Sequence, residues 1–404
     1  MATAADIVAA SWSGRNIWAV VDLDALTTNV QAIADHVGES VRVMAVVKAN
    51  GYGHGAVPVA RAALAGGATE LAVATVDEGA QLRNAGITEP VLALSAIGRH
   101  ERPRAAALGL GIIVTNRDFA HALAADAKAA LVKDPVSIHL KIDSGMNRFG
   151  AEPDEALTVA QAIASHSNLR LDGVMTHFAC ADAEFRSFTD AQAARLDDCL
   201  AQLANAEIPV PTVHIANSAA TLRFPEYHRN MVRLGIAMYG LVPDRSIPLL
   251  PGMKPALTIH GRLIRVHTLE SGEAVGYGAT HTVTAPESVG LVTMGYADGY
   301  RRSLSNRAWA SIRGQRADVV GRVSMDQLVL RIPDGLEVGS GEPVTLVGNG
   351  TGDTSPAPTL DDLADIAGTI GYELATGLAP RVPRVYVAGG QVVGIADLAG
   401  YREL

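Results

Sequence analysis

Large aromatic rings and cysteines are scarce in this sequence of 404 residues. Aromatic residues make up 4% of the chain, and there are two cysteines, Cys180 and Cys199. Two cysteines cannot form the disulfide framework of a small secreted domain, and these two lack the spacing of a zinc site. We therefore expect a reducing, cytoplasmic location and no bound metal. Alanine, valine, leucine and glycine are abundant instead, which favours close packing of helices on a sheet.

Excess positive charge and long hydrophobic runs are also missing. Lys and Arg number 33 against 42 Asp and Glu, which gives a net charge of −9. Because the chain has no basic stripe or tail, this balance argues against nucleic acid or an anionic membrane as a partner. No apolar run reaches the roughly 18 residues that a membrane helix needs. The first residues lack the basic start of a signal peptide, so we expect a short extension before Asn16.

Short apolar runs alternate with alanine-rich amphipathic segments over the first part of the chain. The runs expected to be strands are residues 41–47, 71–74, 91–94, 111–114, 136–142, 171–176, 212–215 and 231–234. Strands that alternate with helices pair in parallel through right-handed crossovers. Eight such strands predict a (β/α)8 barrel of the TIM type. A doubly wound open sheet is the alternative, but the chain lacks its G-x-G-x-x-G motif.

The pattern changes after a proline-rich segment at residues 248–255. Short alternating runs separated by glycine-containing turns replace the helical periodicity, which predicts a mainly-β domain. Its expected strands include residues 256–266, 274–277, 289–294 and 385–393, with one helix at 360–366. The sequence thus predicts an α/β barrel domain at residues 1–254 and a β-rich C-terminal domain at residues 255–404.

Polar residues stand where several predicted barrel strands end, which is where barrel enzymes place their chemistry. They are Lys48, Lys141 with Asp143, His177, Asn217 with Ser218, and Arg233. Lys48 ends an apolar strand and opens a glycine-rich segment. Desolvation there disfavours the ammonium form, so this amine could act as a nucleophile or a base. For a lysine considered alone, a surface position after a strand is the more ordinary explanation.

The other strand-end residues also admit both structural and functional interpretations. Arg233, followed by Gly235, suits an anion such as a phosphate, although an isolated arginine more often forms a structural ion pair. Ser218 could cap a helix or contact a phosphate. His177 could be a satisfied core histidine, or a histidine kept neutral by a nearby cation. Arg148 has the forked geometry that clamps a carboxylate.

Nine segments, taken in order, give these residues a common interpretation. They are AVVKANGYGHG, KIDSGMNRFG, GVMTHFA, HIANSAA, VRLGIAMYG, GYGATH, GYADGY, GRVSMDQ and GTIGYE. Together they resemble the motifs of the alanine racemase family, and they extend over nearly the whole chain. Those enzymes use pyridoxal 5'-phosphate on an eight-stranded α/β barrel that is followed by a β domain. One such motif would be weak, but nine in order are a specific match.

The resemblance implies a set of contacts with the cofactor. Lys48 would form the Schiff base, and Arg233 would face the pyridine nitrogen with His177 hydrogen-bonded to it. Arg148 would contact the phenolic oxygen and the carboxylate of the substrate. The phosphate would be held by Tyr52, Ser218, Gly235, Ile236 and Tyr372, with Asn217 among the cofactor contacts.

The resemblance also implies a homodimer with shared active sites. Tyr277, Met325 and Asp326 would come from the partner subunit, with Met325 near the substrate, and Tyr296 would line the entry corridor. Lys48 would be the base on the D face of the substrate and Tyr277 the base on the L face, which interconverts L- and D-alanine. Lys141 is often carbamylated in such enzymes, and a carbamate would orient Arg148. The implied role is supply of D-alanine for peptidoglycan.

Three alternative functions share part of this assignment of residues. A broad-specificity racemase acting on serine, lysine or arginine would use the same catalytic residues, although bulk at Leu94 and Met325 favours alanine. A decarboxylase on the same architecture should lack a tyrosine between glycines and the KIDSGMNRFG segment. A non-catalytic carrier of pyridoxal phosphate would not need a β domain bearing Tyr277 and Tyr372.

Overall fold

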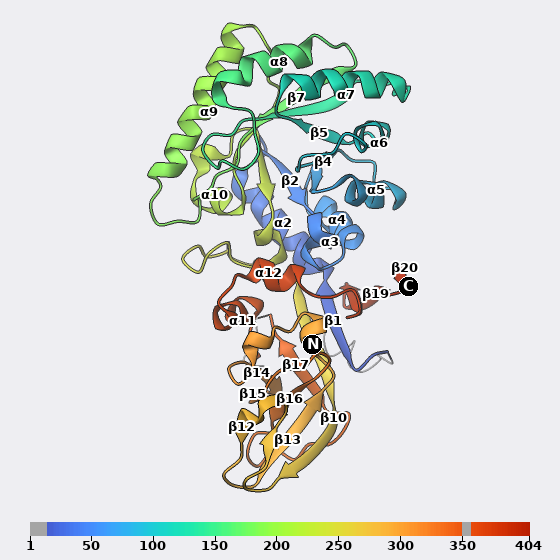
Figure 1. Ribbon diagram of the computed structural model, residues 1–404, viewed down its shortest axis with the longest axis vertical. Coiled ribbons are helices and arrows are strands. Elements are labelled where there is room, and N and C mark those ends of the chain that lie inside the picture. Colours follow the sequence, from blue (N-terminus) through green and yellow to red (C-terminus); the bar gives the residue numbers. More distant parts are fainter. Residues whose placement is uncertain (1–13, 350–356) are drawn as a thin grey trace.

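The computed structural model of the chain describes residues 14–349 and 357–404. The molecule is elongated, with an α/β domain at one end of the long axis and a β domain at the other (Figure 1). The extension expected before Asn16 falls largely on residues 1–13, outside the described part. Among the described helices, none is long and apolar enough to cross a membrane.

The first domain is the barrel that the alternating pattern predicts. Its eight parallel strands lie in the order β8-β7-β6-β5-β4-β3-β2-β9. They are β2 Arg42–Val46, β3 Glu70–Val73, β4 Val91–Ala93, β5 Gly111–Val114, β6 Val136–Lys141, β7 Leu169–Met175, β8 Val213–His214 and β9 Met231–Leu234. The ring is nearly closed, because two backbone bonds join the edge strands: Asn230 N to Val213 O at 3.2 Å and Arg233 N to Ala216 O at 3.0 Å.

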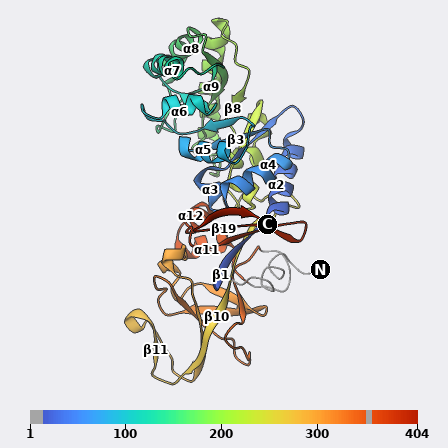
Figure 2. The same cartoon turned by 90° about the vertical axis from the view of Figure 1, so that its right-hand side faces the viewer.

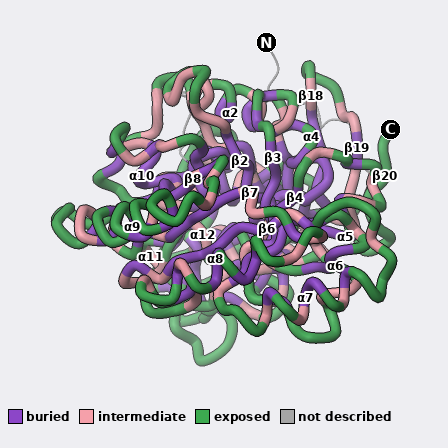
Figure 3. The backbone as a smooth tube through the Cα atoms, turned by 90° about the horizontal axis from the view of Figure 1, so that it is seen from above, coloured by how far each residue is buried: buried purple, intermediate pink, exposed green. Residues whose placement is uncertain are grey.

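Helices surround these strands and turn their polar faces outward. Seen from above, buried strands occupy the centre and exposed helix faces form the rim (Figure 3). The helices are α2 Leu23–Val37, α4 Ala56–Ala65, α5 Val76–Asn84, α6 Arg102–Ala107, α7 Arg117–Ala129, α8 Ala156–Ala164, α9 Ser187–Asn205 and α10 Ser218–Arg223, together with the short turn α3 Lys48–Tyr52. In α4 the buried stripe is mostly alanine, with Ala60 and Ala63 at most 1% exposed. Such small side chains let a helix lie close to the sheet.

The second domain is built on an antiparallel sheet. Its strands are ordered β13-β16-β15-β14-β17-β10-β1-β18-β19-β20. They are β10 Leu257–Leu269, β13 Glu287–Val292, β14 Trp309–Ile312, β15 Gln315–Val320, β16 Leu328–Arg331, β17 Pro343–Val347, β18 Arg384–Ala388, β19 Gln391–Asp397 and β20 Gly400–Glu403, with β11 Ala274–Val275 and β12 His281–Thr282 in a separate hairpin. Figure 2 shows the long strand β10 extending through this domain.

The first strand of the chain belongs to this second sheet. β1 (Ile17–Asp22) pairs antiparallel with β10 and parallel with β18, where Val20 lies opposite Val385. Residues from both ends of the chain therefore form the junction between the domains. We keep a boundary near residue 254 as a proposal, with β1 as an N-terminal segment that crosses it.

Asp22 caps α2, since its side chain accepts the amide of Ala25 at 2.9 Å. Two local expectations for the β domain were wrong. The single strand expected at 385–393 is the hairpin β18–β19, because Gly389 and Gly390 take positive φ and reverse the chain. A second helix, α12 (Gly371–Thr376), follows the expected helix α11 (Leu360–Ala367).

Arg384 fastens the β domain to the barrel. Its side chain is 3% exposed, and its guanidinium donates to four backbone carbonyls. Nε reaches Gly53 O at 3.0 Å in the turn after Lys48, and the other nitrogens reach Leu378, Ala379 and Val382 at 2.6 to 2.7 Å. The carbonyl of Gly53 is thereby satisfied by a strand of the other domain.

Replacing Arg384 by methionine should destabilise the protein, because the stem would be kept while buried carbonyls lost their donor. We expect the free energy of unfolding to fall by about 3 kcal/mol, measured by urea denaturation. Arg402→Met is the matched control. Arg402 is half-exposed in β20 and pairs with Asp397 at 2.9 Å, so its loss should cost less than about 0.5 kcal/mol. Equal losses in the free energy of unfolding for the two variants would contradict the role of Arg384 in joining the two domains.

Candidate active site at the mouth of the barrel

A cavity of about 870 Å³ opens where the barrel strands end. It brings together every barrel residue that the sequence singled out except Asp143, and adds Tyr372 from the β domain. These lining residues are Lys48, Tyr52, Lys141, Arg148, His177, Asn217, Ser218, Arg233, Gly235, Ile236 and Tyr372. Leu94 and Phe149 add apolar wall, and Ile370 and Thr376 flank Tyr372 on the side of α12.

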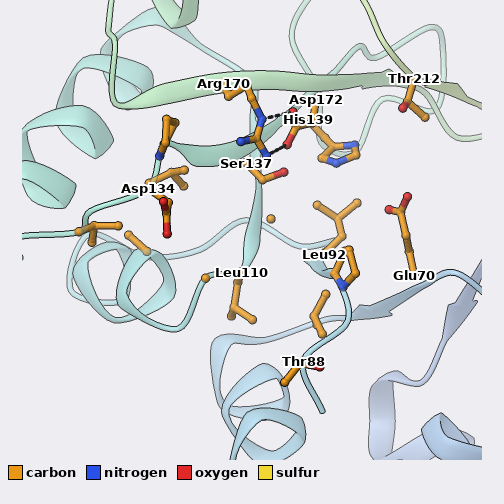
Figure 4. A pocket seen from close by; sticks show the side chains of 18 of the residues that line it. Glu70, Thr88, Leu92, Leu110, Asp134, Ser137, His139, Arg170, Asp172 and Thr212 are labelled. Atoms are coloured by element: carbon orange, nitrogen blue, oxygen red, sulfur yellow. Dashed lines mark hydrogen bonds and ion pairs between the residues drawn. The ribbon is translucent and has the colours of Figure 1, made fainter. Parts of the chain in front are cut away.

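A second, larger cavity of about 1080 Å³ lies at the opposite end of the strands. Four of its charged side chains form two ion pairs. Arg170 donates to both carboxylate oxygens of Asp172 at 2.6 and 2.8 Å (Figure 4), and Arg42 contacts Glu70. Because Arg170 and Arg42 are already neutralised by carboxylates, this end of the barrel is less suited to bind a charged ligand than the mouth.

Lys48 sits at the start of a left-handed turn. The backbone angles (φ, ψ) are 52° and 50° at Ala49, 54° and 48° at Asn50, and 59° and 47° at Gly51, with φ 48° at Tyr52. Only glycine adopts this region readily, and other residues lose about 1–2 kcal/mol there. The turn swings the chain away from β2 and leaves Lys48 at the cavity wall. The sequence predicts a glycine-rich turn here but does not indicate that the turn is left-handed.

The surroundings of Lys48 shift the pKa of its amine in both directions, with a net lowering. Burial and the nearby guanidinium of Arg148 lower the pKa of Lys48, while Glu78 opposes that shift. A lowered pKa makes a neutral, nucleophilic amine more accessible near neutral pH.

Arg233 carries a buried positive charge, and its described hydrogen-bond partners are neutral. The side chain is 3% exposed, and its five hydrogen bonds within the described chain go to carbonyl oxygens and histidine nitrogens. Burial lowers the pKa of Arg233 to about 10, so the group still keeps its protons at neutral pH.

These bonds fix the protons on two histidines. An arginine can only donate, so Nδ1 of His177 and Nδ1 of His214, each 3.1 Å from a guanidinium nitrogen, must accept. Each ring therefore carries its proton on Nε2, and His214 donates to Nδ1 of His139 at 2.9 Å. Burial lowers the pKa of His177 and His214 well below the usual value, and Arg233 adds to the shift. Both rings are neutral, as expected for His177 beside an arginine.

Gly235 and Ser218 form a small cradle in the cavity wall. A Cβ on Gly235 would lie 3.0 Å from the hydroxyl of Tyr52 and 3.7 Å from that of Ser218, so only glycine leaves the space open. Ser218 does not cap α10. Asn217 does, by accepting the amide of Ala220 at 3.0 Å, and the Ser218 hydroxyl instead accepts the amide of Gly235 at 2.9 Å. The cap thus holds Ser218 against the cradle.

Tyrosine rings line the cradle on the side of the β domain. The ring centroid of Tyr52 lies 4.8 Å from Tyr239 and 6.2 Å from Tyr372. Burial raises the pKa of Tyr52 to about 12 and also raises that of Tyr372 above its ordinary value. Both hydroxyls therefore stay protonated and can donate hydrogen bonds to an anion.

Lys141 and Arg148 lie together on another wall. Burial lowers the pKa of Lys141 to about 8, helped by the charges of Arg148 and Arg233 and opposed by Asp143. Asp143 accepts the amides of Gly145, Asn147 and Arg148 at 2.9 to 3.0 Å, and so organises the loop that carries Arg148. Two cations face each other here at a partly buried position.

The predicted residues of the β domain, apart from Tyr372, lie outside the cavity of their own chain. Tyr277 is 72% exposed, Met325 53% and Tyr296 43%. Tyr277 stands between glycines with φ of 65° and 75°, in a turn where the strand expected at 274–277 has already ended. Asp326 is bonded to Arg381 at 2.7 Å, and Arg381 also bonds the buried Asp298 beneath Tyr296.

Two supporting residues were missed from the sequence. His214 is the first residue of HIANSAA and precedes the polar strand end by a few positions, so alternation along the strand could have marked it as facing inward. Glu78 lies in α5 and bonds the amide of Ala49 at 2.6 Å. Nothing in the local pattern around Glu78 indicates a contact with residue 49.

Comparisons with known proteins agree with this arrangement. The alanine racemase N-terminal domain family matches residues 21–243 and the alanine racemase C-terminal domain family matches residues 256–386. The chain is 41% identical over 377 residues to the alanine racemase of Symbiobacterium thermophilum, which covers 93% of this chain and 98% of that protein. It is 40% identical over 392 residues to that of Geobacillus stearothermophilus, with 96% and 98% covered.

Solved structures give the same result. Alanine racemase from Bacillus anthracis with bound L-Ala-P superposes with a TM-score of 0.89 at 37% identity, covering 96% of this chain and 98% of that one. Alanine racemase from Streptomyces coelicolor superposes with a TM-score of 0.87 at 35% identity, covering 95% and 99%. In sequence and in three dimensions, over both domains, the chain belongs to the alanine racemase family, whose curated members are isomerases.

Proposed function

We propose that this protein interconverts L- and D-alanine with pyridoxal 5'-phosphate bound at the barrel mouth. The observation that carries the proposal is the composition of one cavity. A lysine with a lowered pKa, a buried guanidinium and an open cradle of hydroxyl donors line the same wall. Family membership then favours alanine as the substrate.

The cavity fits the proposed cofactor. The cradle at Gly235 has room for a phosphate that a Cβ would fill, and Tyr52, Ser218 and Tyr372 supply hydroxyls around it. A phosphate accepts such hydrogen bonds and is favoured by backbone amides such as those at Gly235 and Ile236. Asn217 supports the cradle through its cap on α10.

Arg233 and His177 suit a pyridine nitrogen that carries no proton. Arg233 keeps its protons at neutral pH and can donate a hydrogen bond to a ring nitrogen without giving up a proton. His177 holds Arg233 by accepting a hydrogen bond from its guanidinium at 3.1 Å. Arg148 supplies a forked donor for a carboxylate and for an anionic oxygen.

Racemisation needs a base on each face of Cα. The cofactor, when bound, withdraws electrons from Cα and so acidifies its proton. Lys48 would move this proton on the D face, and the partner subunit's Tyr277 would move it on the L face. Removal from one side and return on the other inverts the configuration, while Arg148 holds the substrate carboxylate in place.

The position of Tyr277 supports a homodimer with shared sites. In its own chain Tyr277 is 72% exposed and lies outside the cavity, as do Tyr296, Met325 and Asp326. A tyrosine held in a rigid glycine turn at the surface can serve a second copy of the chain. We therefore place Tyr277, Met325 and Asp326 in the partner's site, with Tyr296 at its entrance.

Exchange of the Cα proton in deuterated water tests this function. The wild-type enzyme should invert L-alanine and introduce deuterium at Cα. Tyr277→Phe should lower racemisation by roughly 10²–10⁴-fold, because the L-face base is lost, yet still exchange the proton of D-alanine through Lys48. Tyr401→Phe, which removes a partly exposed hydroxyl in β20, is the control and should behave as wild type.

The same assay separates the alternative functions. L-serine, L-lysine and L-arginine should react much more slowly than L-alanine, and comparable rates would indicate a broad-specificity racemase. Release of CO₂ from the substrate would indicate a decarboxylase. Absence of exchange on every amino acid, with cofactor bound, would indicate a carrier and contradict the proposal.

We further propose that Lys141 carries a carbamate. With its pKa lowered to about 8, part of Lys141 is neutral near neutral pH and can attack CO₂. The neutral nitrogen forms a bond to carbon and releases one proton as the carbamate forms. Counted from the ammonium form, which must first lose a proton of its own, two protons are released and a cation becomes an anion. That anion would attract Arg148, where the unmodified lysine repels it, and would hold Arg148 in place for the substrate.

Carbon NMR in the presence of ¹³C-labelled bicarbonate tests this modification. The wild-type protein at pH 8 should give a carbamate resonance that disappears in Lys141→Ala. Lys133→Ala is the control, because Lys133 is an exposed lysine far from the mouth, and it should keep the resonance. A wild-type spectrum without a Lys141-dependent signal would exclude the carbamate.

A further inference from the structure

Glu78 joins the ends of two barrel strands behind Lys48. It is the third residue of α5 and forms a capping box with Thr75, whose hydroxyl accepts the amide of Glu78 at 3.2 Å. One carboxylate oxygen, Oε2, accepts the amides of Ala74 and Thr75 at 2.6 and 3.1 Å. These contacts are what a helix cap requires.

The second oxygen serves a different purpose. Oε1 accepts the amide of Ala49 at 2.6 Å, 29 residues earlier in the chain. This amide belongs to the peptide that links Lys48 to Ala49. α3 and α5 lie side by side at this edge of the barrel, so one carboxylate bridges the ends of β2 and β3 (Figure 1).

The bridge reaches the chain where the backbone is strained. Ala49 is the first residue of the left-handed turn, with φ 52°. Strained backbone persists only when surrounding contacts hold it. Other side-chain contacts hold the later part of the turn: the Asn50 side chain accepts the amide of Ala56 at 3.1 Å, Nδ1 of His54 bonds Tyr52 O at 2.9 Å, and Arg384 donates to Gly53 O. Glu78 holds its beginning, next to Lys48.

Glu78 is also an anion that acts on Lys48. Among the described residues, the other charged or titratable groups coupled to Lys48 are Arg148, Lys141 and His177, and none of them is acidic. The acidic Glu373 also lines the cavity, but it is paired with Arg301 at 2.7 Å. Glu78 opposes the effect of burial and of Arg148 on the amine. A single side chain therefore influences both the place and the charge of Lys48 without lining the cavity.

We propose that Glu78 is a positioning residue for Lys48, which holds the strained peptide after it and tunes the amine by charge. The catalytic part of this proposal rests on the proposed racemase function. Its structural part, the control of Lys48 by Glu78, can be measured without that function.

Three variants separate the roles of Glu78. Glu78→Gln removes the charge and keeps one oxygen, which can still accept the Ala49 amide. Its NH2 group then faces the amides of Ala74 and Thr75, so this variant also weakens the cap of α5, as Thr75→Ala does. Glu78→Ala removes the charge and all of these contacts. Thr75→Ala weakens the cap of α5 and leaves the Ala49 contact in place, so it is the matched control. Circular dichroism and the unfolding midpoint show whether each variant is folded.

The first measurement is acylation of Lys48 in the full chain before cofactor is added, located by mass spectrometry over a range of pH. The midpoint of the rate should fall by about half a pH unit or more in Glu78→Gln, because the anion is lost. Thr75→Ala should keep the wild-type midpoint.

The second measurement is steady-state racemisation of alanine by the holoenzymes. Glu78→Ala should lower kcat by roughly 10- to 100-fold with KM within about twofold, since a displaced base slows proton transfer without removing substrate contacts. Glu78→Gln should retain more of kcat than Glu78→Ala.

Two results would overturn the proposal: a Glu78→Ala enzyme with wild-type kcat and an unchanged Lys48 midpoint, or a Thr75→Ala enzyme with the same losses as Glu78→Ala. If the wild-type protein fails to racemise alanine, the proposed function fails. The acylation midpoints then still decide whether Glu78 controls Lys48.

Discussion

The buried charge of Arg233 is the constraint on which the site depends. A guanidinium in the interior must satisfy its donors, and here all of its described bonds go to neutral acceptors. Those bonds fix the backbone ends of β7 and β8 and set the tautomers of His177 and His214. They also leave the charge without a neutralising carboxylate among its hydrogen-bond partners. A wall that keeps such a charge is suited to an electron-rich ligand.

The strained turn after Lys48 is held from both domains. Glu78 holds its first peptide from α5 of the barrel, and Arg384 of β18 holds the carbonyl of Gly53. α12 brings Tyr372 to the same place. The β domain thus supports the cavity of its own chain, while Tyr277 lies exposed outside that cavity.

Much of the barrel could be predicted because its signals are local. Apolar runs of four to seven residues mark strands, and polar residues at the ends of several of them mark the mouth. Most contacts that fail to show in the sequence are long-range. The pairing of β1 with β18 and the bond from Glu78 to Ala49 join residues that are far apart in the chain. The cap by Asn217 is local, but the Ser218 hydroxyl is engaged by the distant amide of Gly235, which the sequence does not reveal. The left-handed turn was also hidden, because Ala49 and Asn50 adopt it without being glycine.

We propose that Lys48 of one subunit and Tyr277 of the other act at one site. Hybrid dimers formed by co-expressing Lys48→Ala and Tyr277→Phe chains test it most directly, because each variant alone has lost one base from every site. If sites are shared between subunits, a hybrid dimer has one site with both wild-type residues. Random pairing should then restore about one quarter of wild-type racemisation, as symmetric exchange of subunits requires. A mixture no more active than its separate components would contradict the account.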